Sequence, residues 1–419
     1  MKTTWEEYRN IEEFPSLTKS ASPDVVIVGG GMAGLLSAYL ISKEGKKVII
    51  LEKGRIAAGV TMYTTAFLTH SLDTDYTDLI KIYGNKNAKT IIDSHRKAID
   101  LIEQIVRDER IDCDFTRCSN YIYANSKKDT KGFEDELNAI KELGGKGKII
   151  QQVNDLGFKN AGYLEIQNQA KFNPLKFVSA LLKTLKKMGV KIYENTEVVK
   201  VGSDGDTGEV ETKSKIILLP KWVIVATYEP LDQPLRLFFK KGLYVSYVLE
   251  AELKNIKIKE GTYEDTYNPY HYFRIDEVNG TQRLIAGGED HRQEIKMAES
   301  KNFNSLKEYL DKTIGKENYK VTKKWRGPIL EPVDGIAHIG RLDPENVLYA
   351  MSFSGNGMTY SGISAIIFSD IISGRKSKYE RIYSPKRIPN FQSLLTKGKD
   401  YGEEFVKGAL KNIVIQRKR

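Results

Sequence analysis

The order of apolar and polar positions near the N-terminus predicts a strand, a helix and a second strand. Residues 24–28 form a short apolar run, and glycines follow it directly. Within 34–44, apolar side chains recur at helical spacing: Leu35, Leu36, Tyr39 and Leu40. The run 48–51 is again apolar, as is typical of a strand buried on both faces. This order predicts the beginning of a βαβ unit and therefore a parallel sheet.

Further along the chain, the pattern changes from helices and buried strands to strands that alternate along their own length. Apolar spacing and helix-start residues predict three more helices: 86–109, a helix from Asn173-Pro174 onward, and 358–372. Residues 222–227 read as a third buried strand. Residues 243–252 and parts of 270–288 alternate between apolar and polar side chains, which is typical of half-buried strands in an antiparallel sheet.

The segment between the first strand and the first helix fits the pattern G-x-G-x-x-G, as Gly29-Gly30-Gly31-Met32-Ala33-Gly34. Such glycines allow a tight turn, a close approach of the backbone to a pyrophosphate, and close packing of the helix on the strand. The helix N-terminus also presents free N–H groups to phosphate. Glu52 ends the second strand, 18 residues after Gly34. Its carboxylate suits a ribose diol and would repel a 2′-phosphate, so the motif predicts a dinucleotide site that disfavours NADP.

Composition and charge exclude several other kinds of protein. The two cysteines, Cys113 and Cys118, fit neither a CxxC pair nor a zinc site, and we expect no metal site. No apolar run approaches the roughly 18 residues needed to cross a bilayer, and the polar N-terminus does not resemble a signal peptide, so we expect a cytoplasmic protein. The net charge of +10 is spread out except at 183–191 and the C-terminus, and no nucleic-acid-binding motif accompanies it.

Four further segments give the chain a resemblance to a known family. They are 59–65 (GVTMYTT), 222–227 (WVIVAT), 334–340 (DGIAHIG) and 355–359 (GNGMT). Together with the glycine motif, they resemble the glycine/D-amino acid oxidase (DAO-like) family of FAD-dependent oxidoreductases over about residues 20–380. Segments 64–66, 223–227 and 287–291 are most similar to members fused to a Rieske domain. The chain has no Rieske cysteine–histidine pairs, so any electron carrier would be a separate protein.

The resemblance implies FAD bound in an extended pose along the chain. The implied contacts are Gly29, Gly31, Met32, Ala33 and Gly34 around the pyrophosphate, Glu52 with its neighbour Lys53 at the ribose, Val199 at the adenine, Thr61 and Thr65 near the flavin or phosphates, Ala226 and Thr227 at the end of the third strand, and Gly355, Gly357, Met358 and Thr359 at the flavin pyrimidine edge. A helix that begins near Met358 would stabilise negative charge on the reduced flavin. The alternative for these last glycines is a simple helix-entry turn.

The expected fold is α/β, with an α+β second lobe. A Rossmann-like FAD-binding domain with a parallel central sheet would comprise 1–75, 155–240 and 327–419. A substrate domain with an antiparallel sheet would comprise 76–154 and 241–326. The active site is expected where that antiparallel sheet faces the flavin.

The substrate side departs from the amino-acid oxidases of this family. Their Gly-Leu-Arg-Pro-type stretch carries an arginine that can bind a substrate carboxylate, and Ile329 stands at that position here. Arg326 is three residues away, an odd shift that would turn it to the other face of a strand. This departure disfavours an amino-acid substrate.

The catalytic candidates are Arg274, His291, Tyr272 and His70. Tyr272 and Arg274 share a strand face that can bind a carboxylate, although the face can equally be a solvated outer surface. His291 is a candidate general base, with a loop histidine as the alternative. His70 follows the flavin-side threonines and is a candidate to approach, or covalently attach, the flavin ring.

The expected reaction is FAD-dependent oxidation of a small amine, amino acid or hydroxy acid by hydride transfer to flavin N5. Two alternatives remain open at this point. The basic tail 400–419 can dock on anionic lipid, which would make the protein a membrane-associated flavoprotein that passes electrons to a separate carrier. The other alternative is a flavin-binding module without turnover. The pattern assigns no electron acceptor and no oligomeric state.

Overall fold

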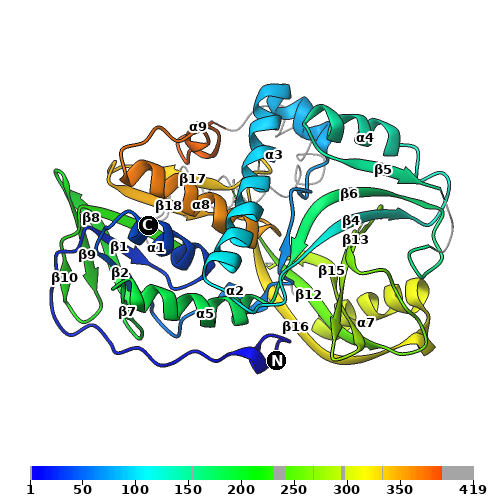
Figure 1. Cartoon of the computed structure of the whole chain (residues 1–419), viewed down its shortest axis with the longest axis horizontal. Helices are drawn as coiled ribbons and strands as arrows, with labels where there is room; N and C mark the ends of the chain where they lie inside the picture. Colours follow the sequence, from blue (N-terminus) through cyan, green and yellow to red (C-terminus); the bar gives the residue numbers. More distant parts are fainter. Residues whose placement is uncertain are drawn as a thin grey trace, which may run out of the picture.

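Two large sheets form the two ends of the protein, with the long helix α3 between them (Figure 1). The computed structural model describes residues 2–151, 155–229, 241–267, 269–293, 298–332 and 334–388. The basic tail 400–419, for which membrane docking was considered, lies outside the described residues. No helix in the described ranges is long and apolar enough to cross a membrane.

The first sheet has six strands in the order β17-β18-β11-β1-β2-β7. Their bounds are β1 (Val25–Val28), β2 (Val48–Leu51), β7 (Lys191–Tyr193), β11 (Trp222–Tyr228), β17 (His338–Arg341) and β18 (Val347–Met351). β1 runs parallel to β2 and to β11, whereas β17 is antiparallel to β18. Every residue of β1 and β2 is buried, which confirms the predicted parallel sheet with both faces covered.

Helices cover one face of this sheet and a small sheet covers the other (Figure 1). The helices are α1 (Met32–Lys43), α3 (Tyr76–Asp108), α5 (Pro174–Lys187) and α8 (Gly357–Ile372), and α8 packs against both α1 and α3. The small sheet comprises β8 (Val198–Asp204), β9 (Thr207–Thr212) and β10 (Ile217–Leu218). Because successive β1 side chains point to opposite faces, Val25 and Ile27 join the helical core, while Val26 and Val28 face the small sheet.

The helix boundaries follow local chemistry. Asn173 caps α5, since its side chain accepts hydrogen bonds from the N–H groups of Leu175 (3.2 Å) and Lys176 (3.1 Å). Helix α3 starts at Tyr76, ten residues before the predicted 86–109, and it bends at Gly84, where φ is 70°. Glycine tolerates this left-handed conformation, so the helix continues on both sides of a kink at Gly84.

The second sheet has nine strands and is mostly antiparallel. Its path is β16-β12-β15-β14-β13-β4-β6-β3, with β5 on the edge of β6. The bounds are β3 (Phe67–Leu68), β4 (Thr116–Ala124), β5 (Gly147–Ile150), β6 (Gly162–Lys171), β12 (Lys241–Leu253), β13 (Gly261–Asp265), β14 (His271–Val278), β15 (Thr281–Arg292) and β16 (Tyr319–Pro332). β13 pairs with β4 in parallel, as the one parallel pairing among the described strands of this sheet.

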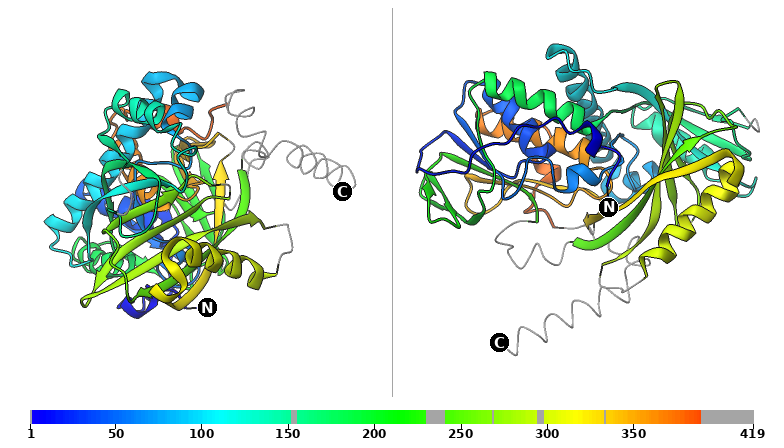
Figure 2. Two further views of the ribbon diagram at one scale, coloured as in Figure 1. Left: turned by 90° about the vertical axis from the view of Figure 1, so that its right-hand side faces the viewer. Right: turned by 90° about the horizontal axis from the view of Figure 1, so that it is seen from below.

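Smaller elements complete both ends. α4 (Phe133–Glu142) packs on α3 and β5, and α7 (Glu299–Leu310) packs on β12 and β15. The short helices are η1 (Glu6–Tyr8), α2 (Val60–Tyr63), η2 (Asp311–Gly315), η3 (Lys316–Asn318) and α9 (Glu380–Tyr383). The N-terminal segment lies where the two halves meet, since Thr4 bonds to Glu250 of the large sheet and Trp5 bonds to Thr64 O (Figure 2).

Sheet membership differs in places from the expected domain boundaries. β6 falls in the 155–240 segment assigned to the FAD domain, yet it pairs with β4 in the large sheet. Helix α3 falls in the 76–154 segment assigned to the substrate domain, yet it packs along α8. The chain therefore crosses between the two halves more often than periodicity alone suggests, and the domain boundaries themselves stay a prediction.

Candidate active site

The glycine motif forms a tight cradle between β1 and α1. Gly29 has φ = 114°, and a Cβ there would lie 2.4 Å from the carbonyl oxygen of Ala226 on β11. A Cβ on Gly34 would lie 2.1 Å from the carbonyl oxygen of Gly29. Both positions require glycine, because a side chain at Gly29 would clash with the backbone of β11 and a side chain at Gly34 would force α1 away from β1. This is the geometry that brings backbone close to a pyrophosphate.

The polar groups around the cradle suit a dinucleotide. Gly31 is the N-cap of α1 and has no side chain to occupy the helix N-terminus. Thr61 Oγ1 accepts a hydrogen bond from Met32 N at 3.1 Å, so α2 is tied to the first turn of α1. Glu52, at the end of β2, accepts hydrogen bonds of 2.8 Å from Gly30 N and Gly54 N. These contacts hold the Glu52 carboxylate beside the cradle, where a ribose of FAD would be bound.

Among the predicted adenine-side and strand-end residues, Ala226 and Thr227 lie against Gly29 of the cradle. Val199 is 43% exposed on β8, and Lys53 is exposed after β2. Thr227, near the end of β11, donates a hydrogen bond from Oγ1 to Glu229 O at 2.6 Å. The contacts of these residues with FAD stay a prediction.

The predicted flavin end is the N-terminus of α8. Asp73 accepts hydrogen bonds there from Gly355 N (3.2 Å), from Asn356 Nδ2 (3.5 Å) and from the Ser354 hydroxyl. Within the first turn of α8, Thr359 Oγ1 accepts a hydrogen bond from Thr69 N at 3.1 Å. The loop after β3 is thus fastened to the start of α8. Met358 and Thr359 are buried in that first turn, and Gly357 begins it.

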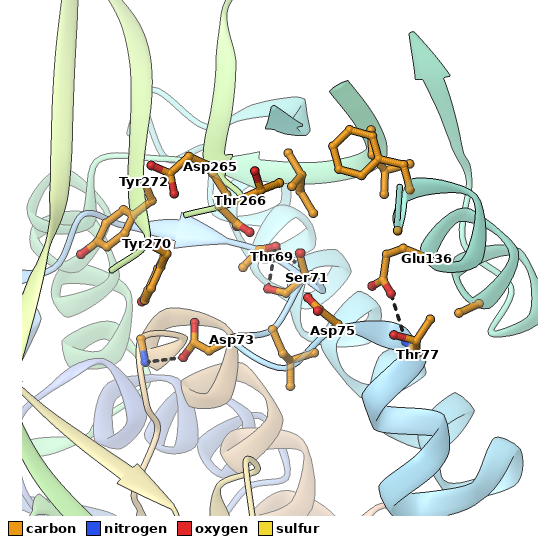
Figure 3. Close-up of a pocket in the computed structure, with 18 of the residues that line it drawn as sticks. Thr69, Ser71, Asp73, Asp75, Thr77, Glu136, Asp265, Thr266, Tyr270 and Tyr272 are labelled. Atoms are coloured by element: carbon orange, nitrogen blue, oxygen red, sulfur yellow. Dashed lines mark hydrogen bonds between the residues drawn. The ribbon is translucent and has the colours of Figure 1, made fainter. Parts of the chain in front are cut away.

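A cavity of about 860 Å³ opens beside this helix end. Thr65, Gly355 and Asn356 line it from the expected cofactor side. Tyr270 and Tyr272 line it from the large sheet, and Figure 3 shows them facing Asp73 across the space. The cavity therefore lies at the predicted place, where the large sheet meets the FAD-binding half.

The lining of this cavity is strongly acidic. Eight carboxylates line it: Asp73, Asp75, Asp129, Asp135, Glu136, Glu142, Glu264 and Asp265. Among the described lining residues, Lys81 is the single cation, and it is paired with Asp78 at 2.8 Å. The charge of Glu136 is partly compensated, since its carboxylate accepts hydrogen bonds from the N–H groups of Tyr76 and Thr77 at the start of α3. Figure 3 shows the bond from Thr77. Glu264 is largely protonated at neutral pH, but the other carboxylates still outnumber the one lysine, so the described lining favours a cationic occupant.

Glu264 is a carboxylate of the sheet wall and lies on β13. Its Oε1 accepts a hydrogen bond from Asn120 Nδ2 at 3.2 Å, and Asn120 Oδ1 in turn accepts one from Thr262 Oγ1 at 2.8 Å. Burial and the neighbouring charge of Asp73 raise the pKa of Glu264 to about 8. No pattern in the sequence marks Glu264 as a site residue.

Tyr270 and Tyr272 form an aromatic part of the cavity wall. The rings of Tyr270 and Tyr272 stack with centroids 5.9 Å apart, and Phe67 meets Tyr272 edge-on at 5.7 Å. Burial raises the pKa of Tyr272, so its hydroxyl stays protonated at neutral pH. Tyr272 was a predicted site residue and does line the cavity, while its catalytic role stays a prediction.

Arg274 shares the Tyr272 face, as the alternation predicted, but it does not line the cavity. Its side chain is 2% exposed, and its guanidinium is occupied by Asp276 and by main-chain carbonyls. A substrate carboxylate has no access to it. The predicted carboxylate-binding role of Arg274 therefore gains no support from the geometry.

The two candidate histidines do not line the cavity either. His70 is 1% exposed, with Nδ1 2.6 Å from the Tyr76 hydroxyl and Nε2 2.8 Å from Gln169 Nε2, and burial lowers its pKa to about 3. His291 stacks on Tyr247 at 5.7 Å, on a different part of the sheet. Neither ring is among the cavity's lining residues, so the catalytic roles predicted for them lack a geometric basis.

Ile329, the residue at which the sequence departs from the amino-acid oxidases, lies at the cavity wall. Arg326, by contrast, pairs with Glu299 of α7 at 2.8 Å. Among the lining residues that the structure describes there is no arginine. The described part of the lining thus offers no guanidinium to a substrate carboxylate.

The fold, the glycine cradle and the adjoining cavity define a flavin-dependent oxidoreductase, and comparisons with known proteins give its family. The family model for FAD dependent oxidoreductase (DAO) matches residues 24–371. The chain therefore belongs to this family, is an FAD-dependent oxidoreductase and binds FAD. The predicted resemblance, fold class and cofactor are confirmed.

Individual relatives are similar over most of the chain. YhfW of Bacillus subtilis (strain 168), whose name describes it as a Rieske 2Fe-2S iron–sulfur protein, is 30% identical over 99% of this chain and 82% of its own length. Gamma-glutamylputrescine oxidoreductase of Escherichia coli (strain K12) is 23% identical over 90% of this chain and 89% of its own. Glycine oxidase from Geobacillus kaustophilus has a TM-score of 0.75 at 16% identity, covering 88% of this chain and 100% of that structure.

Proposed function

We propose that this enzyme oxidises the C–N bond of a cationic amine that carries no α-carboxylate. The acidic cavity at the junction of the two halves is the observation that carries the proposal. An α-carboxylate entering it would meet eight carboxylates and no arginine among the described lining residues, whereas an ammonium group would be stabilised there. When bound, FAD supplies the acceptor for a hydride from the substrate carbon at flavin N5.

The chain's own residues would bind and orient such a substrate. Glu264 presents a carboxylate held by Asn120, which suits an ammonium group through a charge-assisted hydrogen bond. The stacked rings of Tyr270 and Tyr272 offer faces for a cation or for an alkyl chain. Ile329 adds an apolar surface where a carboxylate-binding arginine would otherwise stand.

Proton transfer must accompany oxidation, because a protonated amine cannot lose hydride from its neighbouring carbon. Glu264 is the candidate base. Its pKa of about 8 lies close to neutral pH, which is where a general base works best. Tyr272 is unsuited to this role, since burial keeps its hydroxyl protonated.

The relatives' names fit this proposal unequally. A relative is named for gamma-glutamylputrescine, which agrees with an amine substrate. Others are named glycine oxidase, which is an amino-acid activity. The acidic lining and Ile329 favour the first class.

The test is anaerobic reduction of the FAD-loaded enzyme by a panel of diamines, monoamines, amino acids and hydroxy acids. Reduction is measured as the loss of the flavin's visible absorption. We expect rapid bleaching by diamines and none by hydroxy acids. Bleaching confined to amino acids or hydroxy acids would refute the amine assignment. The absence of bleaching by any compound would favour a flavin-binding module without turnover.

The electrons are proposed to leave through a separate carrier protein. The similarity to YhfW, whose name refers to a Rieske 2Fe-2S protein, supports this. Reoxidation of the reduced enzyme by dioxygen, by a quinone and by a Rieske protein can be compared by stopped-flow. Fastest reoxidation by dioxygen would contradict the carrier. The cytoplasmic location stays a prediction.

A further inference from the structure

Four successive main-chain carbonyls at the cavity edge are bound by three buried side chains from distant parts of the sequence. Trp325 Nε1 donates to Tyr63 O at 3.0 Å, and Trp5 Nε1 donates to Thr64 O at 2.6 Å. Arg274 Nη1 donates to the next two carbonyls, those of Thr65 and Ala66, at 2.9 Å each. Trp5, Trp325 and Arg274 are each at most 2% exposed. Residues 63–66, which we name the pinned turn, join α2 to β3.

The pinned turn has a backbone conformation that needs support. Ala66 has φ = 58°, in the left-handed region that residues with a Cβ disfavour. Its amide N–H donates to Thr64 Oγ1 at 2.9 Å, and its side chain is fully buried. Strained residues of this kind persist only where their surroundings hold them, and they concentrate at functional sites.

The support beneath the turn is itself rigid. Arg274 Nε and Nη2 both bind Asp276 Oδ1, at 3.0 and 2.7 Å, which fixes the direction of the guanidinium. Lys171 and Arg283 also bind Asp276, at 2.9 and 3.2 Å. Although burial opposes ionisation, these three cations hold the pKa of Asp276 well below its usual range. The Asp276 carboxylate therefore stays charged and paired.

The N-terminal segment completes the support. The ring of Trp5 lies 5.5 Å from the guanidinium carbons of both Arg274 and Arg283, an arrangement typical of cation–π contacts. The Thr4 hydroxyl donates to Glu250 of β12, which fastens the same segment to the large sheet. The right-hand view of Figure 2 places the N-terminus at this junction.

The pinned turn connects the two functional parts of the molecule. On its N-terminal side, Thr61 of α2 bonds to the first turn of α1 in the FAD cradle. On its C-terminal side, Thr65 and Phe67 line the substrate cavity on either side of the buried Ala66. Because buried side chains hold all four carbonyls, we expect the side of the turn that faces the cavity to have one fixed shape.

We propose that Trp5, Trp325 and Arg274 are positioning residues that fix the pinned turn as a rigid wall between the FAD cradle and the substrate cavity. Arg274 thus acts through the main chain of residues 65–66 rather than on substrate. The proposal rests on FAD binding and on the position of the cavity, and it is independent of which substrate class enters.

A tryptophan-to-phenylalanine series tests this directly, since the chain has three tryptophans. Trp5→Phe and Trp325→Phe each keep a ring but remove one hydrogen bond to the pinned turn. Trp222→Phe is the matched control, because Trp222 lies on β11 with its ring 6.0 Å from the Arg341 guanidinium, away from the turn. The visible circular dichroism of bound FAD and its reduction potential are measured in the resting, FAD-loaded proteins, so no substrate is required.

We expect Trp5→Phe and Trp325→Phe to change the flavin's visible circular dichroism and its reduction potential. In a separate anaerobic assay with a reducing substrate, flavin reduction should slow roughly fivefold, the equivalent of one lost hydrogen bond. Trp222→Phe should match the wild type. Unchanged spectra and potentials in both test variants, with FAD bound and the fold intact by far-ultraviolet circular dichroism, would overturn the proposal.

Arg274→Lys provides a second, independent comparison. Lysine keeps the positive charge but lacks the planar fork that binds Asp276 together with the main-chain carbonyls of Thr65, Ala66 and Phe172. We expect it to resemble Trp5→Phe in its flavin spectrum. If Arg274→Lys fails to fold, the tryptophan series still decides the matter. If only the amine proposal is wrong, these spectral changes remain while diamines fail to bleach the flavin.

Discussion

Asn120 Nδ2 donates a 3.2 Å hydrogen bond to Glu264 Oε1 across the parallel pair β4–β13. This contact holds a carboxylate in the wall of the cavity, and the amide that holds it is itself 1% exposed. A fixed carboxylate costs less entropy to engage than a mobile one, so it recognises an ammonium group more selectively. Glu264 is for this reason the residue on which the proposed substrate class depends most.

Replacing Glu264 by glutamine should weaken binding of cationic amines. Loss of a charge-assisted hydrogen bond in a half-buried site corresponds to a roughly tenfold to hundredfold increase in Kd or KM. The matched control is Glu277→Gln, an exposed change on β14 of the same sheet. Anaerobic titration of both variants with one diamine measures the difference. Equal affinities in Glu264→Gln and in the wild type would exclude Glu264 from substrate binding.

The raised pKa of Glu264 gives amine binding a defined pH dependence. Burial and Asp73, with smaller effects from Asp75 and Asp265, raise it to about 8, so the carboxylate ionises as pH rises through that value. Affinity for a permanently cationic amine should therefore increase between about pH 7 and about pH 9, and the increase should be absent in Glu264→Gln. A parallel increase in both proteins would assign the dependence to another group.

The same shift predicts a stability difference of known sign. The folded-state pKa of Glu264 lies above its unfolded value of about 4.3, so the folded state binds the extra proton. The stabilisation is complete below the unfolded pKa and is lost as pH rises through about 8. The midpoint temperature of thermal unfolding of the wild type should therefore fall relative to that of Glu264→Gln as pH is raised. A constant difference across this range would contradict the buried environment of Glu264.

His70 should behave as a structural residue. Its folded-state pKa of about 3 lies below the unfolded value, so its contribution is present above about pH 6.5 and is lost as pH falls towards 3. His70→Leu should lower the free energy of unfolding at neutral pH by about 1–3 kcal/mol, because the Tyr76 hydroxyl and Gln169 lose a partner. The difference in the free energy of unfolding between His70→Leu and the wild type, measured by urea unfolding, should become smaller towards pH 5. A large loss of flavin-reduction rate in a stable variant would instead restore a catalytic role.

Gly34→Ala should abolish FAD binding. The added Cβ would lie 2.1 Å from Gly29 O, which forces α1 away from β1 and opens the cradle. Gly59→Ala is the matched control, since a Cβ at Gly59 has no heavy atom within 4 Å among the described residues outside its chain neighbours. Visible absorbance of the purified proteins, and titration with added FAD, separate the two. Normal FAD content in Gly34→Ala would show that the cradle tolerates a wider turn.

Local pattern accounts for the parts of the fold that were predicted. The β1–α1–β2 unit, the glycine turn and the Asn173 cap each depend on residues close together in sequence, so periodicity and motif spacing reveal them. The alternation of Tyr272 and Arg274 likewise predicted their shared face. The burial of that face at Arg274 was not predicted. Arg274 is covered by Thr65 and Ala66, which lie more than 200 residues earlier in the chain, and local pattern does not reveal such a contact.

The carboxylate wall could not be predicted for the same reason. Glu264 lies on a five-residue strand without alternating polarity, and its partner Asn120 is 144 residues away. The burial of His70 depends on Gln169, 99 residues away. Pattern alone also favoured His70 because it follows the threonines of the pinned turn, although only its neighbours Thr69 and Ser71 line the cavity. Long-range packing decides which side of a loop meets the site.

The central claim is that the cavity accepts a cationic amine and rejects an α-carboxylate, and one matched pair of compounds tests it most directly. Putrescine and ornithine differ by a single carboxylate, so anaerobic reduction of the FAD-loaded enzyme by each isolates that group. The acidic wall and Ile329 predict that putrescine bleaches the flavin at least tenfold faster than ornithine does, the equivalent of about 1.4 kcal/mol. Faster bleaching by ornithine than by putrescine would contradict the account.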